Sequence, residues 1–292
     1  QKYFSITTKV SEIGIINRIK SELSALYDKN EVESFVSLLL DKICGLNTTK
    51  RLISDKIYLS DEQNRRIDDA LERLKRYEPI QYIIGYTDFY GLTLRTDRRA
   101  LIPRPETEEL VDWILYEYSN VGNALDICTG SGCIAVCLAK YLREAKVSAL
   151  DISSEAIGLA RENALNHQLD IVFYQKDIMA TDSLWQKFDL IVANPPYVTL
   201  NERVDMMPNV LNYEPSLALF VDDEDPLIFY RTIARFAQQN LVDGGMLFFE
   251  INRKFGKETV DLLASMGFVD IVPKKDISGN DRFIKGKTQL TT

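Results

Sequence analysis

The sequence contains few residues that could hold a metal ion or form a disulfide framework. There is one histidine, His167, and there are four cysteines, Cys44, Cys128, Cys133 and Cys137. Their spacing matches no zinc-binding pattern, and three of the cysteines fall within one glycine-rich turn and the helix predicted after it. We therefore predict no metal site, reduced thiols that pack as small apolar side chains, and no catalytic role for His167.

Long apolar runs and an excess of basic residues are also missing. No segment reaches the roughly 18 apolar residues of a membrane-spanning helix, and the N-terminal residues lack a signal-peptide core. The net charge is −8, whereas binding to a nucleic-acid duplex needs a basic surface, although a local basic patch stays possible. We expect a cytoplasmic protein without a membrane segment or a direct nucleic-acid substrate, for which a monomer suffices.

Residues 1–80 show helical periodicity and no catalytic constellation. Apolar side chains recur at helical spacing in three segments, 16–26, 32–43 and 67–74. A capping box from Ser60 to Gln63 would begin the third helix, and Pro79 follows its end. This pattern predicts a small helical bundle, which could cover an apolar face of a larger domain, dock a protein substrate, or do both.

The remaining chain predicts a hairpin linker over 81–103 and a catalytic domain over 104–292. Strands are expected at 123–127, 146–151, 170–175, 188–193 and 245–251, with short closing strands at 271–272 and 282–285. Helices are expected from residues 106, 133, 154 and 255, and near 225–240. This alternation predicts an α/β fold of the Rossmann-like kind, an open and mostly parallel sheet with helices on both faces. Ligands of such sheets bind at the carboxyl ends of the strands.

The first strand of this domain ends in a glycine-rich turn that is typical of a nucleoside-cofactor site. Gly130 and Gly132 let the backbone turn tightly and approach a ligand. About 20 residues later the next strand ends at Asp151, where a carboxylate can accept hydrogen bonds from a ribose diol. The turn lacks the third glycine of the dinucleotide fingerprint, and Asp126 would oppose a pyrophosphate but suit the cationic S-adenosylmethionine. The candidate cofactor-binding residues are Asp126, Cys128, Thr129, Gly130, Ser131, Gly132, Asp151, Asp177, Ile178 and Asn194.

The most informative motif is Asn194-Pro195-Pro196-Tyr197, which follows a later apolar strand. The side-chain carbonyl of Asn194 and the backbone carbonyl of Pro195 are adjacent acceptors for the two hydrogens of an NH2 group. The Tyr197 ring could cover the flat face of that group. Such a clamp would orient a planar nitrogen, although Asn-Pro alone is also a common turn signal.

Together these motifs resemble the release-factor glutamine methyltransferases, the HemK/PrmC family of S-adenosylmethionine-dependent enzymes. The resemblance covers nearly the whole chain, through the segments 79–85, 89–91, 101–108, 126–132, 194–197, 214–219 and 244–251. The linker segment and the Arg-Pro-Glu-Thr sequence from Arg104 to Thr107 are its most specific parts, since other amino-group methyltransferases share Asn-Pro-Pro-Tyr. Two residues depart from the pattern: Cys128 and Asn252 stand where the family usually has glycine.

The resemblance implies methylation of the side-chain amide nitrogen of glutamine in the Gly-Gly-Gln motif of class I peptide chain release factors. S-adenosyl-L-homocysteine would be the product. Residues 1–80 would then dock the release factor. Asp151 would hold the ribose hydroxyls, Asp177 would contact the adenine amino group, and the turn at Gly130 would lie under the methionine part. The catalytic and substrate-binding residues would be Asn194, Pro195, Pro196 and Tyr197, with Arg104 and Glu106 as further contacts to the substrate.

Resonance delocalises the lone pair of an amide nitrogen, which makes it a poor nucleophile. Hydrogen bonds to Asn194 and Pro195 would favour a nitrogen that loses its planarity as it attacks, without a general base. Two alternatives remain open at this point. One is a DNA or RNA exocyclic-amine methyltransferase that uses the same clamp on a flipped base. The other is a cofactor-binding scaffold without activity, which the intact Asn194 motif disfavours.

Overall fold

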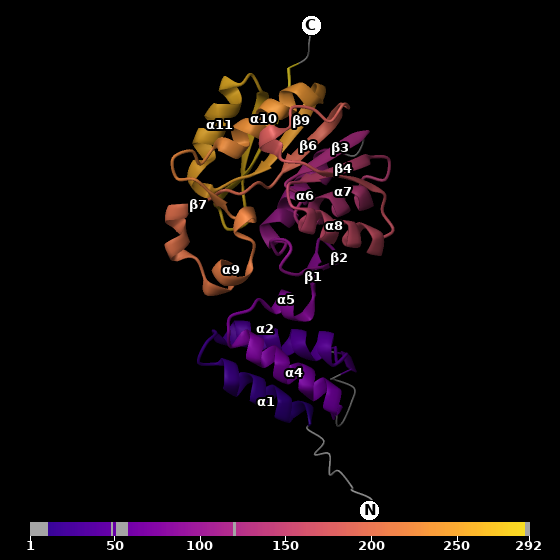
Figure 1. Ribbon diagram of the computed structural model, residues 1–292, viewed down its shortest axis with the longest axis vertical. Helices are drawn as coiled ribbons and strands as arrows, with labels where there is room; N and C mark the ends of the chain where they lie inside the picture. The colour runs from indigo at the N-terminus through magenta and orange to yellow at the C-terminus, as the bar shows by residue number, and fades with distance from the viewer. Residues whose placement is uncertain (1–10, 48, 51–57, 119–120, 290–292) are drawn as a thin grey trace, which may run out of the picture. The chain divides into compact units, whose positions relative to one another are not determined.

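The computed structural model describes residues 11–47, 49–50, 58–118 and 121–289 (Figure 1). Contacts divide the chain into two compact units. One consists of the chain up to Gly85 together with Pro208–Tyr213, and the other consists of Tyr86–Met207 and the chain from Glu214 onward. The first unit therefore includes a segment from the middle of the chain, which the sequence did not indicate.

The first unit is helical, as predicted. Its described helices are α1 (Glu12–Leu23), α2 (Lys29–Leu38) with the π-helical turn η1 (Leu39–Ile43), α4 (Asp61–Leu74), α5 (Ile80–Ile84) and α9 (Pro208–Tyr213). Helices α1, α2 and α4 each begin at a capping residue, Ser11, Asp28 and Ser60, whose side chain accepts a hydrogen bond from a backbone N–H group of the first turn. Ser60 also forms the predicted capping box with Gln63. Apolar side chains of α1, α2, η1 and α4 form one buried core.

Residues 81–84 differ from the prediction of a hairpin, because they belong to the short helix α5. Pro79 precedes this helix and Gly85 ends it with a φ of 80°, a left-handed conformation that glycine adopts readily. The hairpin itself is shorter than predicted and consists of β1 (Tyr86–Phe89) and β2 (Leu92–Arg95).

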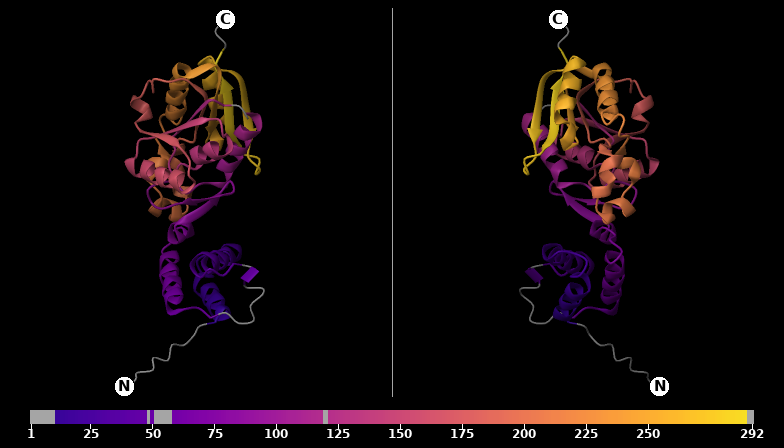
Figure 2. Two further views of the ribbon diagram at one scale, coloured as in Figure 1. Left: turned by 90° about the vertical axis from the view of Figure 1, so that its right-hand side faces the viewer. Right: turned by 90° about the vertical axis from the view of Figure 1, so that its left-hand side faces the viewer.

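The second unit is built on a seven-stranded sheet in the order β10-β11-β9-β6-β3-β4-β5. The strands are β3 (Asn123–Ile127), β4 (Lys146–Asp151), β5 (Ile171–Gln175), β6 (Phe188–Ala193), β9 (Leu241–Glu250), β10 (Val269–Lys275) and β11 (Asp281–Lys287). Pairing is parallel from β9 to β5, and β11 is antiparallel to both β9 and β10. The predicted mostly parallel sheet is therefore confirmed, and its two closing strands form a hairpin at one edge (Figure 2).

Helices cover both faces of this sheet, as the alternation predicted (Figure 1). One face packs against α6 (Pro105–Glu117), α7 (Cys133–Tyr141) and α8 (Ser154–Asn166), and the other against α10 (Ile228–Asn240) and α11 (Gly256–Ser265). Shorter elements complete the unit: β7 (Val198–Thr199), β8 (Phe220–Val221), η2 (Ile178–Ala180), η3 (Leu200–Asp205), η4 (Ser216–Ala218) and η5 (Arg253–Phe255).

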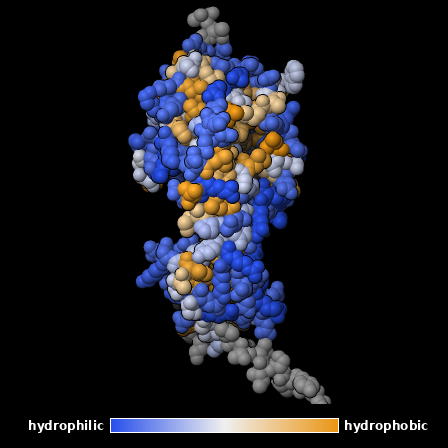
Figure 3. All heavy atoms as spheres, turned by 60° about the vertical axis from the view of Figure 1, so that its left-hand side comes forward, coloured by the Kyte–Doolittle hydropathy of each residue, from blue (hydrophilic) through white to orange (hydrophobic). Residues whose placement is uncertain are grey.

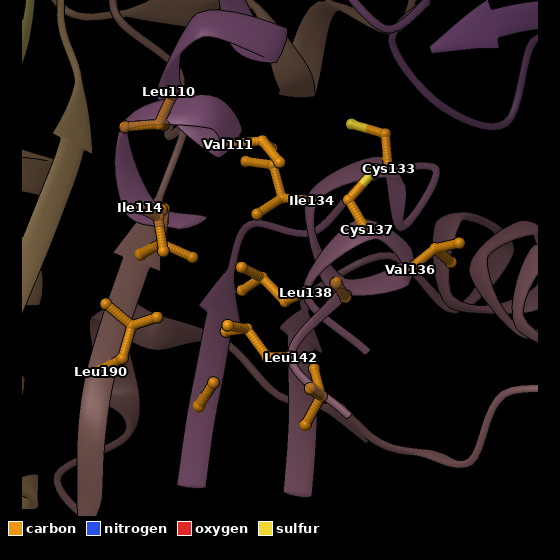
Figure 4. Close-up of a cluster of buried hydrophobic side chains, with 14 of the residues drawn as sticks. Leu110, Val111, Ile114, Cys133, Ile134, Val136, Cys137, Leu138, Leu142 and Leu190 are labelled. Carbon is orange, nitrogen blue, oxygen red and sulfur yellow. The ribbon is translucent and has the colours of Figure 1, made fainter. Parts of the chain in front are cut away.

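The cysteines of α7 pack as core residues. Figure 4 shows Cys133 and Cys137 near Val111, Ile134 and Leu138 in the layer between helices and sheet, and all of these are buried. The thiols are free, and burial raises the pKa of Cys133 to about 12. This confirms that they contribute apolar packing.

Two kinds of feature are absent from the part of the chain that the structure describes. None of its helices combines the length and the apolar character needed to cross a membrane. No group of three histidine, cysteine, aspartate or glutamate side chains there is arranged to hold a metal ion. His167 follows the end of α8, where its Nε2 lies 3.0 Å from the carbonyl oxygen of Thr93.

Candidate active site

A cavity of about 310 Å³ lies at the carboxyl ends of β3, β4, β5 and β6. Its volume is in the range of small-molecule sites. The space-filling view shows apolar side chains gathered on one face of the sheet-containing unit, which is hollowed there (Figure 3). Among the predicted cofactor-binding residues, those that line the cavity are Cys128, Thr129, Gly130, Ser131, Asp151, Asp177, Ile178 and Asn194. Asp126 and Gly132 lie outside its lining.

The turn after β3 depends on residues with left-handed backbone conformations. Gly130 and Gly132 have φ angles of 55° and 80°. A Cβ atom on Gly132 would lie 2.9 Å from the Cβ of Ala160 in α8, so no larger residue fits there without a shift. Cys128 also has a positive φ, of 61°, at the position where the resemblance led us to expect glycine. A non-glycine residue in this region is strained, and the surrounding turn must enforce the conformation.

Asp126 holds this turn from the side of the core. It is fully buried at the end region of β3, and its Oδ2 accepts hydrogen bonds from Thr129 Oγ1 (2.5 Å) and the Ala135 backbone N–H (3.2 Å). Its other oxygen, Oδ1, is buried without a hydrogen-bond partner. Burial raises the pKa of Asp126 to about 7, although its two donors oppose that shift. A direct contact between Asp126 and a cofactor stays a prediction, since its observed bonds are structural.

Asp151 at the end of β4 lines the cavity and also fixes the turn. Its Oδ2 accepts from the Gly130 backbone N–H and its Oδ1 from the Ser153 N–H, both at 2.9 Å. Burial raises the pKa of this carboxyl, while the bonds from Ser153 and Gly130 lower it. Each oxygen keeps a lone pair for a further donor. Asp177, after β5, accepts from the Met179 N–H at 2.8 Å and begins η2, where Ile178 is buried.

The structure brings only part of the Asn194 motif to the cavity. Asn194 and Pro196 line it, whereas Pro195 and Tyr197 do not. Asn194 donates from Nδ2 to Thr107 Oγ1 across 3.4 Å. The Tyr197 hydroxyl donates to Glu250 Oε1 at 3.1 Å. The motif is thus anchored at both of its ends by side chains from other elements.

Sequence reasoning missed Thr107 and Glu250 as site residues and cited them only as parts of resembling segments. Thr107 lines the cavity from α6 and donates to Glu250 Oε2 at 2.7 Å. Glu250 is the last residue of β9 and only 1% exposed. Burial raises the pKa of its carboxyl, and the bonds from Thr107 and Tyr197 and the charge of Arg282 lower it. A carboxylate that ends an apolar strand at the carboxyl edge of the sheet was the available signal.

Asn252, the second departure from the family pattern, ties the Asn194 motif to the loop after β9. Its Nδ2 donates to the Tyr197 carbonyl oxygen at 2.9 Å and to Glu202 Oε2 at 2.8 Å. Its Oδ1 accepts from the Lys254 N–H at 3.0 Å. The side chain therefore adds bonds that a glycine at this position would lack.

Of the two other predicted substrate contacts, Arg104 lines the cavity and Glu106 does not. Arg104 lines the cavity, and its Nη2 donates to Glu214 Oε1 at 2.7 Å. Glu214 is buried and also accepts from the Ile102 N–H at 3.1 Å, so it fixes the segment before α6. Glu106 is half-buried and does not line the cavity. Glu214 was another residue whose role the sequence did not reveal.

The chain is similar to known proteins over most of its length. The Methyltransferase small domain family matches residues 107–212, and the PrmC N-terminal domain family matches residues 15–85. The chain is 46% identical over 268 residues to the release factor glutamine methyltransferase of Flavobacterium psychrophilum, covering 90% of this chain and 94% of that protein. It is 43% identical over 269 residues to the enzyme of that name from Bacteroides thetaiotaomicron, covering 91% and 96%. The crystal structure of a methyltransferase from Pyrococcus furiosus matches 79% of this chain and 100% of its own, with a TM-score of 0.52 and 16% identity, which supports the fold alone.

Proposed function

This chain belongs to the release factor glutamine methyltransferase family, and from that premise we propose its reaction and its substrate. It transfers a methyl group from S-adenosylmethionine to the side-chain nitrogen of glutamine in the Gly-Gly-Gln motif of class I peptide chain release factors. The reaction takes place in the cytoplasm. The single observation that carries this proposal is that Asp151 and Asn194 line the same cavity. One suits a ribose and the other suits an NH2 group.

The residues present fit this cofactor. The Oδ1 of Asp126 is buried and has no hydrogen-bond partner. Burial raises the pKa of this carboxyl to about 7, and a bound ligand with a sulfonium and an ammonium group would favour its ionised form, because opposite charges attract. The free lone pairs of Asp151 suit the ribose hydroxyls, Asp177 the adenine amino group, and the turn at Gly130 the methionine part. When bound, S-adenosylmethionine supplies an electrophilic methyl group on a positively charged sulfur.

The residues of the chain provide orientation and electrostatic stabilisation. Asn194 Oδ1 and the Pro195 carbonyl would accept the two amide hydrogens of the substrate glutamine, and the Tyr197 ring would cover its flat face. Of these three residues only Asn194 lines the cavity itself, so the glutamine would lie at the cavity's edge beside Pro195 and Tyr197. These acceptors hold the nitrogen more strongly once it loses planarity and becomes positively charged, so they stabilise the transition state. The methylated amide then loses a proton to water, and no general base is required. Arg104 contributes a contact to the release factor at the cavity, and Glu106 contributes one beside it.

Methyl transfer from isotope-labelled S-adenosylmethionine tests this function. The substrates are a class I release factor, the same factor with the Gly-Gly-Gln glutamine replaced by alanine, bulk tRNA and ribosomal RNA. We expect label only in the unaltered factor. Label in the alanine-substituted factor would place the target elsewhere, and label in RNA alone would support the nucleic-acid alternative. Cofactor binding without transfer to any substrate would support the inactive scaffold.

A further inference from the structure

We infer that Glu250 and Thr107 are positioning residues that determine which end of the Asn194 amide faces the substrate. The inference rests on the proposed function, because it concerns the atom of Asn194 that accepts the substrate amide hydrogens. Three side chains form one chain of hydrogen bonds, from Asn194 Nδ2 through Thr107 Oγ1 to Glu250 Oε2. Thr107 and Glu250 are 2% and 1% exposed, so water does not replace either partner.

The polarity of this chain follows from the number of protons on each group. A carboxylate only accepts hydrogen bonds, and a threonine hydroxyl has one proton to donate. Thr107 gives that proton to Glu250 at 2.7 Å, so toward Asn194 it can only accept. The NH2 end of Asn194 must therefore face Thr107, which directs Oδ1 away from it.

The opposite orientation of Asn194 would be unfavourable at both of its ends. Its carbonyl oxygen would face the lone pairs of Thr107 Oγ1, and its NH2 group would face a substrate that also presents an NH2 group. Asn194 lines the cavity, so the end that is turned away from Thr107 is the one available to a ligand. The carboxylate of Glu250, which is two hydrogen bonds from Asn194, thus leaves the acceptor Oδ1 of Asn194 facing the ligand.

Glu250 also fixes the other end of the motif. Its Oε1 accepts from the Tyr197 hydroxyl at 3.1 Å, so one carboxylate holds both Asn194, through Thr107, and Tyr197. Arg282 on β11 acts on Glu250 as a nearby positive charge and favours the ionised form. Glu106 on α6 acts in the opposite direction. Burial raises the pKa of Glu250, and the hydroxyl donors on both of its oxygens, together with Arg282, oppose that shift and favour the carboxylate, which only accepts hydrogen bonds.

The decisive variants are Thr107→Val, which keeps the shape of the side chain without the hydroxyl, and Thr107→Ser, the matched control that keeps the hydroxyl. Glu250→Gln tests the carboxylate, since its amide can donate to Thr107 and reverse the chain. We expect Thr107→Val and Glu250→Gln to lower kcat by roughly 10- to 100-fold, below the loss of a direct catalytic contact. KM for the release factor and calorimetric affinity for S-adenosylmethionine should stay within about twofold, and Thr107→Ser should retain most of kcat. A purely structural role predicts instead that thermal unfolding falls in Thr107→Val while kcat stays unchanged, and this result would overturn the inference. So would an equal loss of kcat in Thr107→Ser and Thr107→Val.

A second measurement does not depend on the identity of the substrate. In the NMR spectrum of the folded protein, the Asn194 side-chain amide is assigned by its loss in Asn194→Asp. We expect its proton and nitrogen shifts to change in Thr107→Val and Glu250→Gln and to stay near those of the unaltered protein in Thr107→Ser. Shifts that do not respond to Thr107→Val would refute the hydrogen bond between them. Because this result requires no turnover, it separates failure of the inference from failure of the proposed function.

Discussion

The turn at Gly130 and the loop at Asn194 follow neighbouring strands of one sheet, but they are held in place by different kinds of bond. Asp126 and Asp151 hold the turn through partners that are 3, 9 and 21 residues away in sequence, and two of those three donors are backbone N–H groups. The Asn194 loop is held by the side chains of Thr107, Glu250 and Asn252, across 53 to 87 residues.

This difference separates two tasks. Backbone N–H groups that bind a carboxylate fix the path of the chain, which suits a surface that must fit a cofactor closely. Side-chain bonds fix the orientation of one amide, which suits a contact that matters only as the substrate nitrogen changes its geometry. Substitutions in the turn should therefore change cofactor affinity, and substitutions in the Asn194 loop should change kcat.

Asn194→Ala should give the largest effect. We expect kcat to fall by about 100- to 1,000-fold, as for loss of one preorganised partner of a developing charge. Affinity for S-adenosylmethionine, measured by calorimetry, should stay close to that of the unaltered enzyme. Near-normal turnover by this variant would contradict the amide mechanism, and a large loss of affinity would remove the contrast between the two loops.

Asp151→Ala should act in the opposite way. Loss of hydrogen bonds to a charged group should weaken cofactor binding by roughly 1.5–3 kcal/mol, which is about 10- to 150-fold in Kd. With saturating cofactor, kcat should recover most of its normal value. Calorimetry that finds an unchanged affinity would exclude Asp151 from the cofactor site.

The titration of Asp126, in the turn after β3, should make the free energy of unfolding depend on pH. Burial raises the pKa of Asp126 from the ordinary value of 3.8 to about 7. Between these two pH values the folded state keeps a proton on Asp126 that the unfolded state releases. Its contribution to stability is therefore complete below about pH 4 and is lost as the pH rises toward 7, by up to about 1.4 kcal/mol per pH unit.

Asp126→Asn removes this titration and keeps an acceptor for Thr129 and Ala135. Chemical denaturation of the protein without cofactor should show a weaker decline of stability between pH 5 and 7 in the variant. Parallel curves for the two proteins would mean that Asp126 does not titrate in this range.

The smallest expected effect is that of Asn252→Gly, which introduces the residue typical of the family. Loss of the bonds to Tyr197 and Glu202 should lower the free energy of unfolding by about 1–2 kcal/mol. Because the Glu250 bonds remain, kcat should fall by less than about threefold. A loss of kcat as large as that of Asn194→Ala would show that Asn252, and not Glu250, controls the loop.

The same contrast explains what could be predicted from sequence. The glycine turn, Asp151 and the Asn194 motif are short contiguous patterns at strand ends, so the alternation of strands and helices was enough to bring them to one edge. The bond between Thr107 and Glu250 joins residues 143 apart and depends on the packing of α6 against the end of β9. Helix α5 was missed because its five residues are too few to show a helical period.

The division of the chain also has a consequence for its synthesis. The helical unit ends at Gly85 but is completed by Pro208–Tyr213, where the Tyr213 hydroxyl donates to the Arg76 carbonyl at 2.8 Å. At typical elongation rates, this last piece leaves the ribosome on the order of ten seconds after the rest of the unit. During that interval the nascent helical unit lacks α9, so it reaches its final stability only after β6 and the Asn194 loop have also emerged.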